Sequence, residues 1–402
     1  MRITPGMIEV EQPLTFNIYT EEGQLLLRKG VVIYNQSQID NIYERRCYTT
    51  PEGEVKPEEE VKRDPTATEY VEDLIYRLDI AYNNYVTNGY NLVNDVMRIS
   101  VEIVKQLDDD PDTLIGIVHL RSDLKHSVVR TLQNTVFSVL TAQNMKWEKR
   151  RIIKLACASL TANLGMYPLQ DDLAKHEGPL EDWQKKMIRR HPSQAVKILI
   201  GMGVKDKSWL QAVGFHHERL DGSGYPNGLA GEKVLEEARL LAIADRYGSA
   251  ISPRVGRKPR NPQDIMRVFL DQEKDQYDNT MARHFIAEVG VYPPGVTVML
   301  KNGDVAVVAR RRSKRTCPIV YSVWDPSNNV YKKPIERDTV FPKYAIVEHF
   351  THEDTPRLNA DLFWGSEDQL LGNKSVEIFR TLDENLGVDS QAEEESSEVT
   401  LF

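Results

Sequence analysis

A helical pattern of apolar residues that runs from Thr66 to about Val289 constrains the fold more than any other feature of the sequence. Apolar side chains recur there every three or four residues, which places them on one face of an α-helix. The first such face carries Tyr70, Val71, Leu74, Ile75, Leu78 and Tyr82. The same spacing continues through residues 93–107, 114–142 and 149–164. The pattern predicts a helical bundle, because such faces are stable when they pack against one another.

Shorter β-like patterns flank the bundle on both sides. Residues 13–34 alternate apolar and polar positions around a Glu-Glu-Gly turn, which is typical of a β-hairpin, and a short helix is expected at residues 37–46. After Pro293, valines alternate around a turn at residues 301–304, and a further apolar run covers residues 319–324. The fold class is therefore predicted to be mainly α, with a small N-terminal β/α module and a small C-terminal β module.

These patterns divide the chain into five expected segments. Residues 51–65 are rich in Glu, Lys and Pro and have few large apolar side chains, which favours an exposed linker. Glutamates and serines dominate the end of the chain, which favours an acidic tail. The expected segments are an N-terminal β-hairpin and helix module (1–50), the linker (51–65), a helical domain (66–290), a C-terminal β module (291–352) and a partly helical to disordered tail (353–402).

Composition and charge argue against several classes of protein. Apolar stretches such as residues 240–243 and 296–300 are far shorter than the roughly 20 residues of a membrane-spanning helix, so no membrane span is expected. The first residues contain charges and prolines where a secretion signal has an apolar segment. Cys47, Cys157 and Cys317 are odd in number and scattered, which fits a reducing cytoplasm. The net charge of −9 argues against binding of DNA or RNA.

The chemically informative residues fall in one stretch of the helical region, between about residues 114 and 260. In chain order they are His126, His191, the pair His216 and His217, the loop Asp221-Gly222-Ser223-Gly224-Tyr225-Pro226, Asp245, Arg254 and Arg257. A lone histidine is more often a satisfied polar residue than a ligand, but histidines together with a carboxylate are the side chains that bind transition metals. With these spacings, the stretch resembles the HD-GYP family of the HD superfamily.

The resemblance implies a helical bundle that holds two or three iron or manganese ions, which activate water to attack a phosphodiester, usually in cyclic di-GMP. The family's His-Asp-x-Gly-Lys segment aligns with a segment in which Ala162, Asn163 and Met166 replace the His, the Asp and the Lys. A family glutamate aligns with Ser122. Asp123 is adjacent, but one residue turns a side chain by about 100 degrees on a helix. The chain is therefore identified as a degenerate member that lacks the His-Asp pair.

These replacements predict a weakened metal centre. Ala162 has no electron pair to donate, and the neutral amide of Asn163 cannot match a carboxylate that bridges two cations. The residues expected to bind metal are His126, His191, His216, His217 and Asp245. We expect the three later histidines to hold one iron, manganese or zinc ion, while the first histidine and the aspartate either form a separate weak site or remain as hydrogen-bonded residues. A full di- or trinuclear centre is not expected.

Arg254 and Arg257 match positions that contact phosphate in the family. Because they are three residues apart, they would share a face on a helical turn, where their planar guanidinium groups suit two phosphate oxygens. The alternative is an exposed basic pair that bridges to surface carboxylates. We therefore expect a nucleotide phosphate site at this pair, with cyclic di-GMP as its ligand.

The glycine-rich loop is expected to hold a defined exposed shape, because its glycines permit unusual backbone angles and its proline stiffens the exit. The resemblance implies that such a loop recognises a protein partner, for example a diguanylate-cyclase domain. The residues assigned to this role are Asp221, Gly222, Gly224, Tyr225 and Pro226. The alternative is that the loop only supports the two histidines before it.

A second basic cluster lies in the C-terminal β region. It consists of Arg310, Arg311, Arg312, Lys314 and Arg315. Its Arg-x-x-x-Arg spacing resembles that of PilZ receptors for cyclic di-GMP. The preferred interpretation is a solvated basic hairpin loop.

Three functions remain open on the sequence alone. The first is a bacterial cyclic di-GMP signalling protein that is catalytically weak or inactive and acts by binding nucleotide, a protein partner or both. The second is an active metal-dependent cyclic di-GMP phosphodiesterase with an atypical metal centre. The third is a structural protein that binds neither nucleotide nor metal. We favour the first, because catalytic ligands are missing while the loop and the arginine pair are retained.

Overall fold

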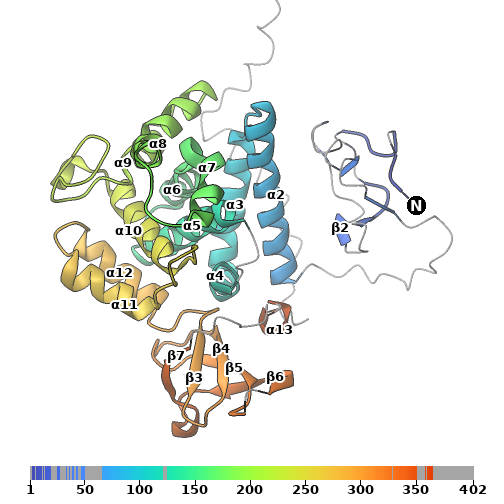
Figure 1. Cartoon of the computed structure of the whole chain (residues 1–402), viewed down its shortest axis with the longest axis vertical. Coiled ribbons are helices and arrows are strands. Elements are labelled where there is room, and N and C mark those ends of the chain that lie inside the picture. Colours follow the sequence, from blue (N-terminus) through green and yellow to red (C-terminus); the bar gives the residue numbers. More distant parts are fainter. Residues whose placement is uncertain are drawn as a thin grey trace, which may run out of the picture.

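The computed structural model describes residues 66–120, 125–327 and 329–350, together with residues 360–364 and scattered positions before residue 50 and at 358. Helices gather in one body, a β-sheet lies at one end of it, and the N-terminal segment lies beside the first long helix (Figure 1). The predicted mainly α fold class is confirmed. The division of the chain into five segments stays a prediction.

Most of the described chain is helical. The helices are α2 (Ala67–Asn88), α3 (Val93–Asp109), α4 (Pro111–Leu120), α5 (His126–Asn144), α6 (Lys149–Thr161), α7 (Tyr167–Lys175), α8 (Asp182–Gly201), α9 (Lys207–Phe215), α10 (Glu236–Ile251), α11 (Pro262–Arg267), α12 (Asn279–Val289) and α13 (Asp361–Trp364). Short helical turns join them at η1 (Leu164–Met166), η2 (Gly231–Lys233) and η3 (Val268–Gln272). These elements place the informative residues of the sequence at helix ends and in the loops between helices.

Local sequence fixes the two ends of α2. The Thr66 hydroxyl accepts a hydrogen bond from the Glu69 backbone N–H at 3.2 Å, and the Glu69 carboxylate accepts one from the Thr66 N–H at 2.9 Å. This reciprocal capping box satisfies two backbone donors that every helix start leaves without partners. At the other end, Gly89 adopts a left-handed conformation with φ of 69°, which stops the helix.

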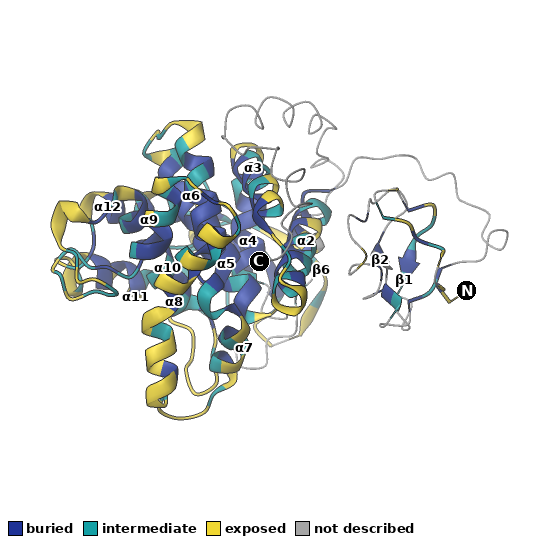
Figure 2. Ribbon diagram, turned by 90° about the horizontal axis from the view of Figure 1, so that it is seen from above, coloured by how far each residue is buried: buried dark blue, intermediate teal, exposed yellow. Residues whose placement is uncertain are grey.

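Helix α5 forms the centre of the bundle. Every residue from Arg130 to Ala142 is buried, because α4, α6, α10 and α12 pack around the helix. Figure 2 shows the dark blue, buried ribbon at this position. The hydroxyls of Thr135, Ser138 and Thr141 donate to backbone carbonyls four residues earlier at 2.6 to 2.8 Å. Because these polar groups are satisfied within the helix, α5 can carry polar side chains into the middle of the bundle.

A five-stranded antiparallel sheet follows the bundle. Its strands are β3 (Thr297–Leu300), β4 (Val305–Arg310), β5 (Ile319–Trp324), β6 (Val330–Asp338) and β7 (Ile346–His349), in the spatial order β6-β5-β4-β3-β7. A helical turn, η4 (Pro342–Tyr344), precedes β7. The predicted turn at residues 301–304 joins β3 to β4. The sheet has its own small apolar core, which includes Val298, Ala306 and Val320.

Basic residues at the end of β4 fasten the sheet to the helices. The Arg311 side chain is 5% exposed; it pairs with the Asp112 carboxylate and, at 3.0 Å, with the Glu288 carboxylate. Arg310 pairs with Asp110 in the same interface. The interpretation as a solvated loop is therefore wrong for these two arginines. Arg311 is also the first arginine of the Arg-x-x-x-Arg motif that resembles PilZ receptors. Its guanidinium already pairs with carboxylates of two helices.

The segment after the sheet returns to the helical body. Trp364 is fully buried, and its indole N–H donates to the Ala309 carbonyl at 3.0 Å. Its ring lies against Gly116 so closely that a Cβ at that position would overlap it. The predicted tail is thus helical at residues 361–364, and its part from residue 365 lies outside the described residues.

Part of the N-terminal module is described. Strands β1 (Ile18–Tyr19) and β2 (Leu25–Leu27) pair antiparallel, which confirms the predicted hairpin. Ile39 and Ile42, within the predicted short helix, are helical and buried. The predicted linker at residues 51–65 lies outside the described residues.

One helical stretch, Lys149–Lys175, is long and apolar enough to cross a membrane by length and composition. Small and polar residues interrupt its apolar side chains, so it contains no long unbroken apolar run. It comprises α6, η1 and α7, and 72% of its most apolar window is buried inside the fold. Such burial is typical of a core helix of a globular domain.

We expect R311M to lower the free energy of unfolding by roughly 3–5 kcal/mol, because it removes the guanidinium from a buried ion pair. R312M is the control, since Arg312 is 39% exposed and pairs with Asp338. This substitution should lower the free energy of unfolding by at most about 1 kcal/mol. Urea unfolding followed by tryptophan fluorescence measures both. Equal losses in the two variants would contradict the role of Arg311 in docking the sheet.

Candidate metal and phosphate site

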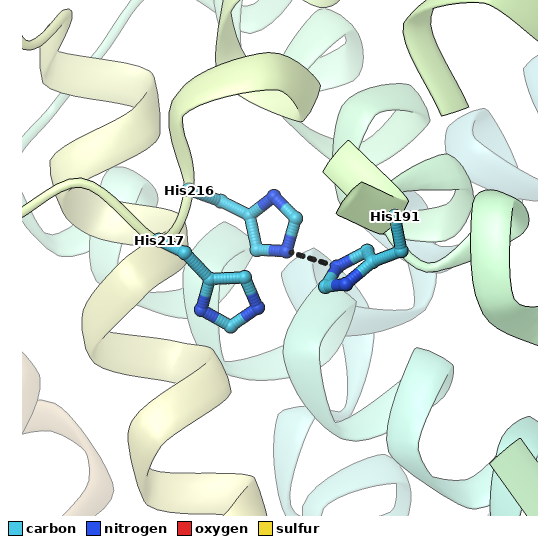
Figure 3. Close-up of side chains that lie close together, drawn as sticks. All are labelled: His191, His216 and His217. Atoms are coloured by element: carbon cyan, nitrogen blue, oxygen red, sulfur yellow. Dashed lines mark hydrogen bonds between the residues drawn. The ribbon is translucent and has the colours of Figure 1, made fainter. Parts of the chain in front are cut away.

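Three histidines from two neighbouring helices meet at the candidate site. His191 lies in α8, and His216 and His217 directly follow α9. Their ligating nitrogens all lie within 4.8 Å of one another, and Figure 3 shows the three rings converging. His191 and His216 are buried, whereas His217 is partly exposed. The structure thus brings together three of the five residues expected to bind metal.

The hydrogen bonds of two of these rings determine which nitrogens carry protons. Nδ1 of His191 lies 2.6 Å from the Ile188 carbonyl oxygen, and Nδ1 of His216 lies 2.7 Å from the Val213 carbonyl oxygen. A carbonyl only accepts, so each Nδ1 carries the proton and each neutral ring has a lone pair on Nε2. The two Nε2 atoms face each other at 3.2 Å. Two lone pairs at this distance require a cation or a proton between them.

Burial argues against the proton. Burial lowers the pKa of His191 to about 3, with the neighbouring His216 adding to the effect, and burial also lowers the pKa of His216. Both rings therefore stay neutral near pH 7. Neutral imidazoles are good ligands for divalent transition metals, and two such ligands on a tetrahedral ion lie about 3.4 Å apart. The donor set of His191, His216 and His217 fits one such ion.

Asp245, a fourth predicted ligand, is held by other residues. It lies on α10, and its Oδ1 accepts hydrogen bonds from Arg130 Nη2 at 2.7 Å and from Asn134 Nδ2 at 2.8 Å. Burial raises the pKa of this carboxyl, but the charge of Arg130 and the hydrogen bond from Asn134 outweigh burial and leave the pKa well below its usual range. Asp245 is therefore ionised, and a guanidinium is its closest counter-charge.

His126, the fifth predicted ligand, belongs to a different environment. It is the first residue of α5 and lies outside the histidine cluster. Burial lowers its pKa to about 3, and the charges of Arg130, Arg254 and Arg257 add to this effect. His126 is thus a neutral ring within the electrostatic reach of three arginines, which is a poor place for a further cation.

Arg254 and Arg257 lie just after α10, near Asp245. The two residues do not lie on a helical turn, because the chain folds into a tight turn in which the Arg257 N–H donates to the Arg254 carbonyl at 2.9 Å and the reverse bond measures 3.3 Å. Both guanidinium groups nevertheless approach Ser249, on the last turn of α10. Arg254 Nε is buried without a hydrogen-bond partner. Two guanidinium groups on one turn, with a buried donor to spare, suit an anion.

The two residues predicted to replace the His-Asp pair directly precede η1, which packs against α8, the helix that carries His191. Ala162 and Asn163 follow α6 and are buried. Gly165 packs so tightly on α8 that a Cβ would overlap the His191 carbonyl oxygen. Ala162 offers no electron pair at this place. Asn163 offers a neutral oxygen, and this Oδ1 is buried without a hydrogen-bond partner.

The glycine-rich loop is fastened to the third histidine. The Tyr225 ring stacks on His217 with centroids 4.7 Å apart, and the Arg189 guanidinium lies over the Tyr225 ring. The buried Glu218 carboxylate accepts backbone N–H bonds from Asn227 at 2.7 Å and Leu229 at 2.9 Å. The loop therefore has a support role for His217, and its role in partner recognition stays a prediction.

Sequence reasoning missed three residues of the site. Arg130 and Asn134 hold Asp245, and Glu218 holds the loop. Arg130 was signalled by its charge within an otherwise apolar helical stretch, four residues after the predicted ligand His126. Glu218 was signalled only by its place directly after the histidine pair. The positions of Ser122 and Asp123 lie outside the described residues.

Comparison with known proteins points to one family. Residues 113–281 match the family model described as HD domain. A cyclic di-GMP phosphodiesterase of Pseudomonas aeruginosa is 26% identical over 219 residues, which are 54% of this chain and 52% of the relative. The cyclic di-GMP phosphodiesterase response regulator RpfG of Xanthomonas campestris pv. campestris is 33% identical over 111 residues, 27% of this chain and 28% of the relative. The chain thus spans about half, or less, of the length of these relatives.

Among solved structures, an HDG"Y"P protein from Bdellovibrio bacteriovorus matches with a TM-score of 0.49 and 13% sequence identity. The match covers 71% of this chain and 97% of that chain.

We expect Zn²⁺ or Mn²⁺ to raise the melting temperature of the metal-free protein, because a cation relieves the two facing lone pairs. When the free metal concentration is a hundred times Kd, metal binding raises the free energy of unfolding by about 2.7 kcal/mol. H216Q should abolish the shift, whereas H284Q should keep it, since His284 bonds to the Asn144 amide outside the cluster. Scanning fluorimetry with elemental analysis measures this. An unchanged shift in H216Q would place the metal elsewhere.

Proposed function

Residues 113–281 of this chain form an HD domain, and from this premise we propose that the protein acts in bacterial cyclic di-GMP signalling by binding the dinucleotide without hydrolysing it at ordinary enzyme rates. The relatives suggest the ligand, because they are named cyclic di-GMP phosphodiesterases. The observation that carries the loss of hydrolysis is the Asp245 carboxylate, whose Oδ1 already accepts hydrogen bonds from Arg130 and Asn134.

Hydrolysis of a phosphodiester by paired metal ions needs carboxylate oxygens that bridge two cations. In this chain, Oδ1 of Asp245 already accepts two hydrogen bonds, and Ala162 has no electron pair. Asn163 supplies an amide oxygen without charge. The histidine cluster suits one iron, manganese or zinc ion, which when bound supplies a Lewis acid. With one ion, the clamp on both the attacking and the leaving oxygen is lost, and several kcal/mol of transition-state stabilisation are lost with it.

Binding of the ligand is assigned to Arg254 and Arg257. Their planar guanidinium groups suit phosphate oxygens. Arg254 is partly buried, which strengthens a charge interaction there, whereas Arg257 is exposed. Arg254 Nε is a buried donor without a partner, which a phosphate oxygen would satisfy. His126 is neutral beside them and adds no positive charge that would have to be compensated.

The glycine-rich loop is the proposed contact for a protein partner, such as a diguanylate-cyclase domain. Glu218 and Tyr225 fix its inner side, whereas Asp221 and Ser223 are exposed on its outer side. A loop of fixed shape with an exposed face suits recognition, and its contact with His217 couples it to the site. We propose a cytoplasmic location and no binding of DNA or RNA, in keeping with the charge of −9.

One observation favours a second candidate, an active phosphodiesterase with an atypical centre. The Oδ1 atoms of Asn163 and Asn134 are buried without hydrogen-bond partners. Amide oxygens are weak ligands for hard cations such as Mn²⁺. If both contributed ligands, the chain would have more donors than the three histidines alone.

A hydrolysis assay on protein of known metal content, run beside calorimetric binding of cyclic di-GMP, separates these functions. We expect binding without turnover. R254A and R257A should each weaken binding about tenfold, or about 1.4 kcal/mol. R267A is the control, because Arg267 is 66% exposed and its nearby carboxylate belongs to Asp264 in the same helix.

Each alternative has its own signature in these measurements. Metal-dependent turnover that H216Q abolishes would establish the phosphodiesterase instead. A structural protein would bind no cyclic di-GMP, and R254A and R257A would change nothing.

A further inference from the structure

Arg130 lies in the middle of the bundle with a side chain that is 3% exposed. Its Nη2 donates to the Asp245 carboxylate at 2.7 Å and to the Asp245 backbone carbonyl at 2.8 Å, and its Nη1 donates to Gln133 Oε1 at 3.3 Å. Gln133 in turn donates to the Val118 carbonyl at 3.0 Å and accepts from the Ser252 hydroxyl at 2.8 Å. The guanidinium therefore has one fixed position.

The fold leaves room for this guanidinium at Gly248, one turn after Asp245 on α10. A Cβ at position 248 would overlap Nη1 of Arg130. Glycine inside a helix costs roughly 1 kcal/mol relative to alanine. The backbone at 248 does not have the positive φ that would require glycine. Space for the guanidinium is thus what this glycine provides.

The cluster around Arg130 keeps an excess of positive charge. Burial lowers the pKa of Arg130 to about 10, and the pair with Asp245 opposes this effect, so the group stays protonated at neutral pH. Arg254 and Arg257 lie close enough to lower the pKa further. Because Asp245 balances one of three guanidinium charges, the remaining charge attracts an anion.

We propose that Arg130 is a resident cation that takes the electrostatic place of a second metal ion, so that a phosphodiester binds at Arg254 and Arg257 without any divalent metal. The proposal deepens the proposed function and rests on it for the identity of the ligand. In a bridging role Asp245 would face two cations, and here it faces a fixed guanidinium instead. Metal at the histidine cluster and phosphodiester at the arginines then bind independently.

The first test measures binding of cyclic di-GMP to the full chain by calorimetry, once in EDTA and once in Mn²⁺. For the wild type, the two Kd values should agree within about threefold. R130M should bind at least about tenfold more weakly in EDTA, with Mn²⁺ restoring part of the affinity. R130K, which keeps the charge, should stay closer to the wild type in EDTA.

The second test measures Mn²⁺ affinity without any nucleotide. In R130M the Asp245 carboxylate beside His216 and His217 loses its counter-charge, so Mn²⁺ affinity should rise at least about tenfold. G248A should also raise the Mn²⁺ affinity, because the added methyl group displaces the Arg130 guanidinium while every charge is kept. G201A is the matched control, since a Cβ there meets nothing within 4 Å. Circular dichroism checks that each variant is folded.

The outcomes separate this proposal from the proposed function. A wild-type Kd that weakens more than about tenfold in EDTA would overturn the proposal. Equal Mn²⁺ affinity in R130M, G248A and the wild type would also overturn it. If cyclic di-GMP binds under no condition, the proposed function fails, whereas a higher Mn²⁺ affinity in R130M and G248A still supports Arg130 as the resident cation.

Discussion

The buried ion pair between Arg130 and Asp245 joins the central helix α5 to α10, and the geometry of the site depends on it. Removing two charged groups from water costs several kcal/mol per ion, and their attraction offsets this only when further hydrogen bonds satisfy the remaining polar atoms. Asn134 and Gln133 supply such bonds. Because the pair is expensive to disrupt, it fixes α10, and with α10 the arginine turn that follows it.

Two sites of opposite electrostatic character result. The histidines are neutral because they are buried, and their facing lone pairs attract a cation. The arginine turn carries two guanidinium groups, and its proposed ligand is an anion. Asp245 interacts with both: its charge favours a cation at His216 and His217, and it balances Arg130. In a centre of paired metals the same carboxylate would be shared between ions, so its contact with a guanidinium changes what the domain is suited to bind.

The surrounding elements hold this arrangement from outside. In the glycine-rich loop, the Tyr225 ring stacks on His217, and the Glu218 carboxylate accepts two backbone hydrogen bonds from the loop. The C-terminal sheet is fastened to α4 and α12 through Arg311, a contact away from the histidines. Basic residues therefore play two roles in this chain. Those on the sheet dock one module on another, whereas those after α10 remain suited to a ligand.

The sequence by itself determined the helical bundle, the flanking β modules and the three histidines, because apolar periodicity and motif spacing are local properties. The degeneracy predicted from Ala162 and Asn163 stays a prediction. Only the tertiary structure decided that His126 lies outside the histidine cluster and within the electrostatic reach of arginines, and that Asp245 is held by Arg130. The contact between Arg130 and Asp245 joins residues 115 positions apart, and burial, which shifts the pKa values of these groups, exists only once the helices have packed.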